Sequence, residues 1–447
     1  MDRRRFILDL AGAAAAAALT PSLASSAALL ARRPRPNVVL IMADDLGYGD
    51  LGFTGRTDYR TPSIDQIARS GVQLTQMYTA APVCTPTRVA LITGRYPART
   101  PAGLYEPLTT HSIGVEPDPP TLGLLLKAAG YDTALVGKWH LGTEPRFHPL
   151  RHGFDEFYGF LGAAADYASH ADTEFRRNLF QDGTRTVHTP GYLTDLLTDR
   201  AVRIVGRPRR RPFFLNLQYN APHWPWQAPG DPPYPDSVRA ASGGSPQTFG
   251  RMVESMDAGV GRVLEALHRA GRERDTLVIF TSDNGGERFS HMGPFSAGKM
   301  TLNEGGLRVA AVARWPEAIA PGSRAGQVAV TMDLAATFLA LAGTHAPPAA
   351  PPDGIDLTPA LTGASGAVPR ELFWRITQRR RQKAVRRGDW KYLQKDDGEF
   401  LYDLSADPGE QRDLKALHPA VFSQLKSRLA AWEREVLPPV PLDPAHA

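Results

Sequence analysis

Four short apolar runs, each followed at once by polar residues, constrain the fold of this 447-residue chain more than any other feature. The first, Asn37–Met42 (NVVLIM), is rich in β-branched side chains, which is typical of a strand buried on both faces. The other three runs follow the same pattern and are Tyr131–Val136, Pro212–Tyr219 and Thr276–Ser282. We therefore expect four buried strands, spaced widely along the chain.

Helical patterns lie between these runs. Thr121–Ala129 reads as a helix that Gly130 stops, and Arg251–His268 carries apolar residues at helical spacing. Because strands that alternate with helices form parallel sheets with both faces covered, we predict an α/β domain over residues 36–345. Its large, mostly parallel sheet would lie between two layers of helices.

The composition changes after this domain. Pro347–Pro352 (PPAAPP) lies at the start of a predicted linker, residues 346–370. The remaining residues, 371–447, show short strand-like runs, a turn signal at Lys395–Gly398 and a final helical pattern over Pro419–Val436. These features predict a smaller C-terminal α+β subdomain, in which an antiparallel sheet packs with one helix.

The N-terminus reads as an export signal over residues 1–31, and the alternative is a disordered basic tail. A twin-arginine pattern, Arg3–Ile7, precedes an alanine-rich stretch that is too short to span a bilayer, and Ala24–Ala27 offers a cleavage site. We therefore expect a periplasmic or secreted protein without a membrane anchor. The formal net charge of +5 is modest for this length, so we expect no nucleic-acid partner.

Each apolar run ends in side chains that can carry chemistry. They are, in chain order, Asp44 and Asp45, Lys138 and His140, His223, and Asp283 and Asn284. Because the carboxyl ends of parallel strands meet at one edge of a sheet, we expect these side chains to form one site, although an Asp-Asp-Leu-Gly stretch also suits a simple turn. The acidic and amide oxygens form a ligand set that Ca²⁺ prefers, with Mg²⁺ less favoured.

The only cysteine of the chain, Cys84, opens the stretch Cys84-Thr85-Pro86-Thr87-Arg88. Pro86 suits the first turn of a helix, and Arg88 would share a helix face with Cys84. Cys84 would then lie near a helix N-terminus, where backbone N–H groups favour negative charge. The simpler interpretation of a lone cysteine is a small buried apolar residue.

The pattern Cys-x-Pro-x-Arg, followed by an apolar run and Thr93-Gly94-Arg95, resembles the signature of the type I sulfatases of the alkaline phosphatase superfamily. This resemblance implies that a formylglycine-generating enzyme oxidises Cys84 to Cα-formylglycine, whose hydrated aldehyde is the nucleophile. It also implies a metal site. Its ligands would be Asp44, Asp45, Asp283 and Asn284, with the modified Cys84.

The resemblance also implies roles for the basic residues. Arg88, Lys138 and Lys299, which lies in the glycine-rich stretch Gly298–Val309, would offset the charge of a sulfate monoester. His223 or Lys299 would protonate the departing alcohol. His140 would help to remove a hydroxyl proton when sulfate leaves.

We therefore predict a sulfuric ester hydrolase that acts on sulfated aryl or carbohydrate substrates. Stretches such as His152–Asp155 and Ala221–Trp224 are similar to the arylsulfatase group that includes glycosaminoglycan-acting members. Two alternatives stay open. One is a phosphonate monoester or phosphodiester hydrolase of the same superfamily, and the other is a sulfated-glycan-binding protein in which Cys84 is unmodified.

Overall fold

The computed structural model describes residues 35–105, 108, 112–173, 180–234, 241–377, 380–396 and 398–440. The predicted export segment, residues 1–31, lies outside the described residues. The chain from Pro36 onward forms one compact unit. In the described part of the chain, no helix combines the length and the apolar character needed to cross a bilayer.

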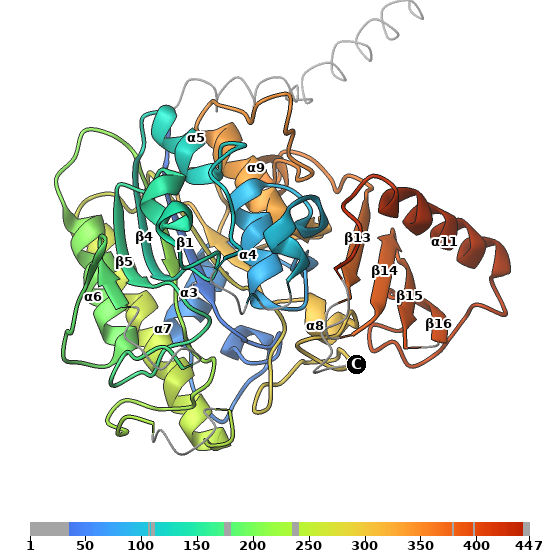
Figure 1. Cartoon of the computed structure of the whole chain (residues 1–447), viewed down its shortest axis with the longest axis horizontal. Helices are drawn as coiled ribbons and strands as arrows, with labels where there is room; N and C mark the ends of the chain where they lie inside the picture. Colours follow the sequence, from blue (N-terminus) through green and yellow to red (C-terminus); the bar gives the residue numbers. More distant parts are fainter. Residues whose placement is uncertain are drawn as a thin grey trace, which may run out of the picture. The chain divides into compact units, whose positions relative to one another are not determined.

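Ten strands of the described chain form one sheet (Figure 1). In spatial order they are β11 (Ser323–Ala325), β2 (Val72–Leu74), β10 (Val312–Arg314), β9 (Thr276–Ser282), β1 (Asn37–Ala43), β8 (Phe213–Gln218), β4 (Asp132–Lys138), β5 (Glu156–Phe160), β6 (Phe180–Asp182) and β7 (Arg185–Thr186). The centre of this sheet, from β9 through β1, β8 and β4 to β5, is parallel. Antiparallel pairing occurs on both sides of that centre, between β10 and both β9 and β2 and along β5, β6 and β7.

The four predicted runs are all strands of this parallel centre. β1 lies between β8 and β9, and Met42 is in register with Gln218 on one side and Thr281 on the other. Because β1, β4, β8 and β9 run in the same direction, their carboxyl ends reach one edge of the sheet. The predicted α/β fold with a mostly parallel central sheet is confirmed.

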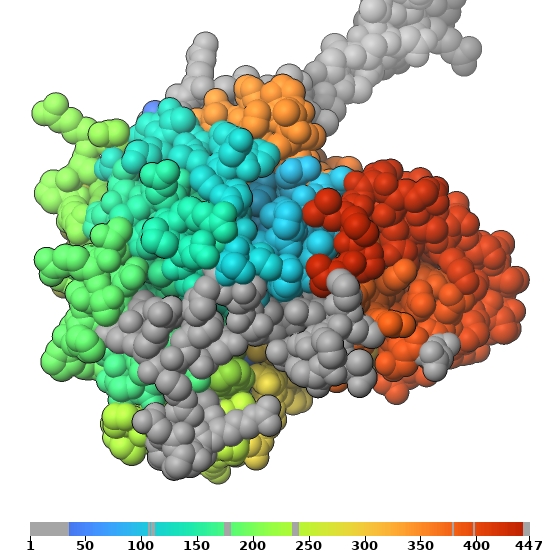
Figure 2. All heavy atoms as spheres, viewed as in Figure 1, coloured from blue at the N-terminus to red at the C-terminus, as the bar shows by residue number. Residues whose placement is uncertain are grey.

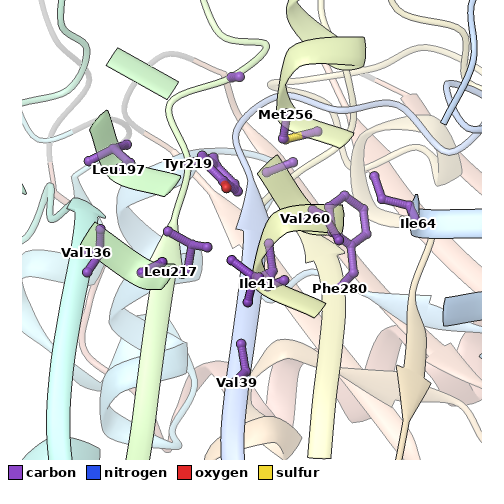
Figure 3. Close-up of a cluster of buried hydrophobic side chains, with 14 of the residues drawn as sticks. Val39, Ile41, Ile64, Val136, Leu197, Leu217, Tyr219, Met256, Val260 and Phe280 are labelled. Carbon is purple, nitrogen blue, oxygen red and sulfur yellow. The ribbon is translucent and has the colours of Figure 1, made fainter. Parts of the chain in front are cut away.

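Helices cover both faces of the sheet. On one face, α3 (Pro62–Ser70), α6 (Leu193–Gly206) and α7 (Pro246–Arg269) pack on side chains such as Ile41 and Leu217 (Figure 3). On the other face, α4 (Cys84–Thr93) and α5 (Leu122–Ala128) contact α9 (Thr331–Leu341), whose Phe338 ring lies 5.6 Å from that of Phe214. The alternation of inward side chains along each strand thus supplies two apolar layers, as expected for a sheet buried on both faces.

The C-terminal part forms a second, antiparallel sheet with one helix. The sheet consists of β13 (Glu371–Ile376), β14 (Gln382–Arg387), β15 (Trp390–Lys395) and β16 (Gly398–Asp403), and α11 (Pro419–Glu433) packs on it. Trp432 stacks on Phe373 with ring centroids 5.4 Å apart and meets the edge of Tyr96, which follows α4. Figure 2 shows this C-terminal region in contact with the segment around α4. The predicted C-terminal antiparallel sheet with one helix is confirmed.

The glycine-rich stretch after Gly298 differs from the sequence expectation of a loop that leads directly into a strand. Glu304–Leu307 forms a single helical turn, α8, and the strand β10 begins only at Val312. The turn is tightly enclosed: a Cβ atom on Gly305 would lie 2.4 Å from the backbone oxygen of Ser296. This close backbone approach explains why glycine occupies the position.

Candidate active site

Two consecutive aspartates follow β1 and form one side of the site. Asp44 is fully buried and Asp45 is 2% exposed. Asp45 adopts a left-handed backbone conformation with φ of 65°. The change of backbone direction lets both neighbouring carboxylates face the same cluster, in which ligand atoms of Asp44, Asp45, Cys84 and His223 all lie within 4.8 Å of one another.

Helix α4 presents Cys84 to these carboxylates. Cys84 is the first residue of the helix, after Val83 in an extended conformation, and its Sγ lies 3.5 Å from Asp44 Oδ1. The first N–H groups of a helix have no intrahelical partner and favour negative charge. The predicted position of Cys84 at a helix N-terminus is therefore confirmed.

Arg88 lies one turn further along α4 and is almost completely buried. Its guanidinium donates hydrogen bonds to Asp283 Oδ2 at 2.8 Å and to Gln218 Oε1 at 2.7 Å. The same group lies 3.8 Å from Asp44 Oδ2. One cation thus connects side chains that follow or end three adjacent strands, β1, β8 and β9.

Two lysines neutralise the two aspartates; Lys138 is buried, and the side chain of Lys299 is 11% exposed. Lys138, the last residue of β4, places its Nζ 2.5 Å from Asp44 Oδ2. Lys299 places its Nζ 2.6 Å from Asp45 Oδ2 and 3.7 Å from Glu287. A buried lysine is tolerated when its charge is paired, so these contacts explain how ammonium groups come to lie inside the protein.

An amide and an imidazole complete the surroundings of Asp45. Asn284 donates from Nδ2 to Asp45 Oδ1 at 2.7 Å. His223 Nε2 lies 3.6 Å from Asp45 Oδ2, and its Nδ1 lies 2.6 Å from the backbone oxygen of Trp224. Because a carbonyl oxygen only accepts, His223 carries a proton on Nδ1 and points Nε2 toward the carboxylate.

His140 lies on the other side of Cys84. It has a left-handed φ of 57°, and its Nε2 is 3.2 Å from both Thr85 Oγ1 and the backbone oxygen of Leu108. Thr85 follows Cys84 in the first turn of α4. His140 is therefore held next to the cysteine by a residue of the same helix.

Burial and charge shift the pKa values of these groups. Burial raises the pKa of the Cys84 thiol far above its usual value, and burial together with Asp44 raises the pKa of Asp283 to about 6. Burial lowers the pKa of His223 to about 3 and that of His140 well below its usual range. For Asp45, burial opposes ionisation, but Lys299 and other neighbouring cations outweigh it and lower the pKa.

The structure brings all the predicted site residues together. Three residues of the site escaped the sequence interpretation, namely Gln218, Thr85 and Glu287. Gln218 is the last residue of β8 (FFLNLQ), and Glu287 lies three residues after Asn284, so position along the chain was the available signal for both. Burial, with Lys299 opposing it, raises the pKa of Glu287 to about 7.

The donor set fits a hard divalent cation. Asn284 Oδ1 is buried and has no hydrogen-bond partner among the described residues, while Nδ2 of the same amide is bonded twice. Three buried carboxylates, those of Asp44, Asp45 and Asp283, belong to the same site, and a bound cation would offset their negative charge. Oxygen donors in this number suit Ca²⁺ or Mg²⁺.

A buried set of carboxylates, amino groups and one thiol at the carboxyl edge of an α/β sheet is typical of the ligand site of an α/β enzyme. Comparison with known proteins agrees with this class. The sulfatase family model matches residues 36–344, and the model described as N-sulphoglucosamine sulphohydrolase, C-terminal, matches residues 297–435.

Individual relatives carry the same names. The chain is 34% identical to steryl-sulfatase of Mus musculus, over 95% of this chain and 86% of that protein. It is 36% identical to N-acetylgalactosamine-6-sulfatase of Mus musculus, over 79% of this chain and 71% of that protein. The solved structure of Ps i-CgsB in complex with k-i-k-neocarrahexaose superposes with a TM-score of 0.82 at 32% identity, covering 93% of this chain and 95% of that chain. The chain belongs to the sulfatase family.

Proposed function

We propose that this sulfatase cleaves sulfate monoesters of aryl or carbohydrate substrates with a nucleophile formed at position 84. The observation that carries the proposal is the placement of Cys84, which begins α4 with its Sγ 3.5 Å from Asp44 Oδ1. A buried thiol beside a carboxylate is a poor nucleophile as it stands, because both surroundings oppose the thiolate. Conversion of Cys84 to Cα-formylglycine would supply a hydrated aldehyde in its place.

The cation would be Ca²⁺, with Mg²⁺ as the less favoured ion. Asp44, Asp45, Asp283 and Asn284 would hold it together with the modified side chain of residue 84. Such an ion would polarise a sulfate oxygen and offset negative charge. The protein itself balances its three acidic ligands with Arg88, Lys138 and Lys299, so a bound divalent cation leaves the site with positive charge for an anionic substrate.

The basic side chains divide into two groups by position. Arg88 and Lys138 lie toward Asp44, on the side of Cys84 and β4, where they would stabilise the sulfate group and orient the nucleophile. Lys299 and His223 both approach Asp45 Oδ2, at 2.6 Å and 3.6 Å. One of these two would donate a proton to the alcohol oxygen as the S–O bond breaks. Lys299 is an ammonium paired with Asp45 and already carries its proton, whereas burial lowers the pKa of His223 to about 3, so His223 would first have to take up a proton on Nε2.

His140 has a place in the second half of the cycle. Its contact with Thr85 keeps the imidazole beside residue 84. Burial and the nearby cations of Lys138 and Arg88 lower the pKa of His140, so the ring is neutral and able to accept a hydroxyl proton when sulfate is released.

The test of this proposal is chemical analysis of residue 84 together with activity. Peptide mass spectrometry of active protein should show the sulfur of Cys84 replaced by oxygen, and the peptide should react with an aldehyde probe. Cys84→Ala should abolish hydrolysis of 4-nitrophenyl sulfate while keeping the fold. Active protein with only a thiol at position 84 would contradict the proposal.

A second measurement separates the alternatives that the sequence left open. Relative rates on an aryl sulfate and an aryl phosphonate ester distinguish a sulfatase from a phosphonate or phosphodiester hydrolase with the same site. Tight binding of a sulfated glycan without turnover, with Cys84 unmodified, would instead indicate a binding protein. The buried set of catalytic groups described above favours turnover.

We also propose that this enzyme is exported and that a second enzyme modifies it during maturation. The twin-arginine pattern in residues 1–31 supports transport to the periplasm or the exterior. A formylglycine-generating enzyme would act on Cys84 during maturation. Fractionation of cells, with detection of the mature N-terminus by mass spectrometry, checks the first part of this proposal.

A further inference from the structure

The segment Ser296–Glu304, here called the Lys299 loop, carries Lys299 into the site from outside the central sheet. Two non-glycine residues of this loop, Ala297 and Met300, have left-handed φ values of 58° and 66°. Such conformations are unfavourable for residues with side chains and persist only when the surroundings impose them. The loop therefore requires restraints from other parts of the protein.

Side chains of the C-terminal subdomain and the segment after β16 supply those restraints. Glu410 Oε2 accepts hydrogen bonds from three groups of the loop, namely Ser296 Oγ at 3.0 Å, Asn303 Nδ2 at 3.0 Å and Glu304 N at 2.7 Å. Gln382, the first residue of β14, accepts a fourth from Leu302 N at 2.7 Å.

A buried lysine fixes Glu410 in turn. Lys391 of β15 places its Nζ 2.8 Å from Glu410 Oε1 and 2.9 Å from Glu304 Oε1. The side chains of Lys391 and both glutamates are fully buried. Glu410 itself has a left-handed φ of 55°, so its backbone is also held in an unfavourable conformation.

The middle of the loop is tied to segments that adjoin the site residues. Lys299 N donates to the backbone oxygen of Gly286 at 3.0 Å, and Met300 N donates to that of Pro82 at 2.8 Å. Pro82 lies two residues before Cys84. The loop is thus fastened to the site through the backbone of Lys299 and Met300, and the contacts to Glu410 and Gln382 at Ser296 and at residues 302–304 lie on both sides of Lys299.

We propose that Lys391, Glu410 and Gln382 are positioning residues that hold the Lys299 ammonium against Asp45. The C-terminal subdomain would thereby determine the position of the group that protonates the departing alcohol. This inference rests on the proposed role of Lys299 as the proton donor to the departing alcohol. A buried ion pair is weak evidence for a role in stability, because apolar residues of the same volume often serve as well or better. A positional role explains why three buried charges converge on this loop.

The experiment is a double-mutant cycle between Glu410→Gln and Lys299→Ala in the full-length, modified enzyme. Single-turnover rates are measured on 4-nitrophenyl sulfate and on a sulfated sugar that the wild-type enzyme hydrolyses. The matched control is Glu399→Gln, which removes a carboxylate from the same subdomain, where it pairs with Lys426 at 2.7 Å. Gln382→Ala serves as a milder variant if Glu410→Gln does not fold.

Misplacement of a catalytic group by about 1 Å costs roughly 100-fold in rate. Glu410→Gln should therefore slow hydrolysis of the sulfated sugar by about 10–100-fold and slow hydrolysis of the nitrophenyl ester much less. Only the sugar alcohol, a poor leaving group, needs the proton. In the Lys299→Ala background the same change should have almost no further effect. Amide hydrogen exchange across residues 296–304 should accelerate in Glu410→Gln and stay as in wild type in Glu399→Gln.

Different failures have different meanings. If the effects of the two substitutions on the rate multiply, or if Glu410→Gln slows hydrolysis of both substrates by the same factor, the positioning role is wrong while the role of Lys299 stands. If Lys299→Ala leaves both rates unchanged, the proposed role of Lys299 is wrong and the positioning role is wrong with it. Absence of any sulfate hydrolysis by the wild-type enzyme would contradict the proposed function as a whole.

Discussion

Mild acid should destabilise this protein through His152, a residue outside the active site. His152 is completely buried, and its ring centroid lies 5.1 Å from that of Trp139. Burial lowers the pKa of His152 to about 4, and the nearby His148 contributes in the same direction. In the unfolded chain a histidine has a pKa of about 6.5. The folded protein therefore keeps this side chain neutral where the unfolded chain would bind a proton.

The sign and size of the effect follow from linkage. Between pH 6.5 and 4 the unfolded state binds more protons than the folded state, so the free energy of unfolding rises with pH in that window. Each pH unit inside the window contributes about 1.4 kcal/mol. Integrated for His152, the loss of stability is about 2 kcal/mol from pH 7 to pH 5 and about 3 kcal/mol from pH 7 to pH 4.

The comparison of wild type with His152→Phe measures this contribution. Urea unfolding at pH 7, 6 and 5 gives the free energy of unfolding of each protein. The difference between the two should shift by about 2 kcal/mol in favour of the variant at pH 5. The control is His268→Gln on α7, which removes an exposed histidine that pairs with Glu273 and should not flatten the pH dependence. If the free energy of unfolding falls by the same amount between pH 7 and pH 5 in wild type and in His152→Phe, the reasoning is refuted.

Three further predictions concern the site. Asp283→Asn should lower bound Ca²⁺ and turnover together, because one of three buried carboxylates is lost. Metal analysis of the purified variant checks this. Full activity of metal-stripped wild type would contradict a role for the cation in turnover. His223→Ala should slow a sugar sulfate by about 10²–10⁴-fold and a nitrophenyl sulfate much less in single-turnover kinetics, if His223 is the general acid; equal losses would assign the acid to Lys299. Arg88→Lys should keep the charge but lose the simultaneous contacts to Asp283 and Gln218. We therefore expect turnover of 4-nitrophenyl sulfate to fall by about 100-fold while the Ca²⁺ content stays unchanged. An unaltered rate would show that charge alone is sufficient.

The sequence was most informative where local pattern and topology act together. Apolar runs that end in polar residues predict strands, and parallel pairing then forces their ends to one edge. For this reason the amino-acid sequence alone assigns Asp44, Lys138, His223 and Asp283 to one site, although these residues lie up to 239 positions apart.

The sequence was least informative where contacts are long-range and carry no periodic pattern. Lys391 pairs with Glu304 across 87 positions, and Glu410 lies 106 positions from the same residue. Neither pair follows from spacing, because charged residues in turns and short strands usually face solvent. Gln218 was missed for a related reason, since a polar residue at the end of a buried strand predicts nothing until its partner, Arg88, is known.

The burial of Cys84 has a consequence for the order of events in the cell. In the folded protein this side chain is 2% exposed, and the residues of α4 from Cys84 to Ile92 are all buried. If Cys84 is oxidised as proposed, the modifying enzyme would have to reach the segment before α4 packs against α9. Under that proposal the rate of oxidation of Cys84 would compete with the rate of folding, and a chain that folds first would keep its thiol for as long as it stays folded. The fraction of active enzyme would then depend on how fast this one helix docks during synthesis, and slower folding at low temperature should raise it.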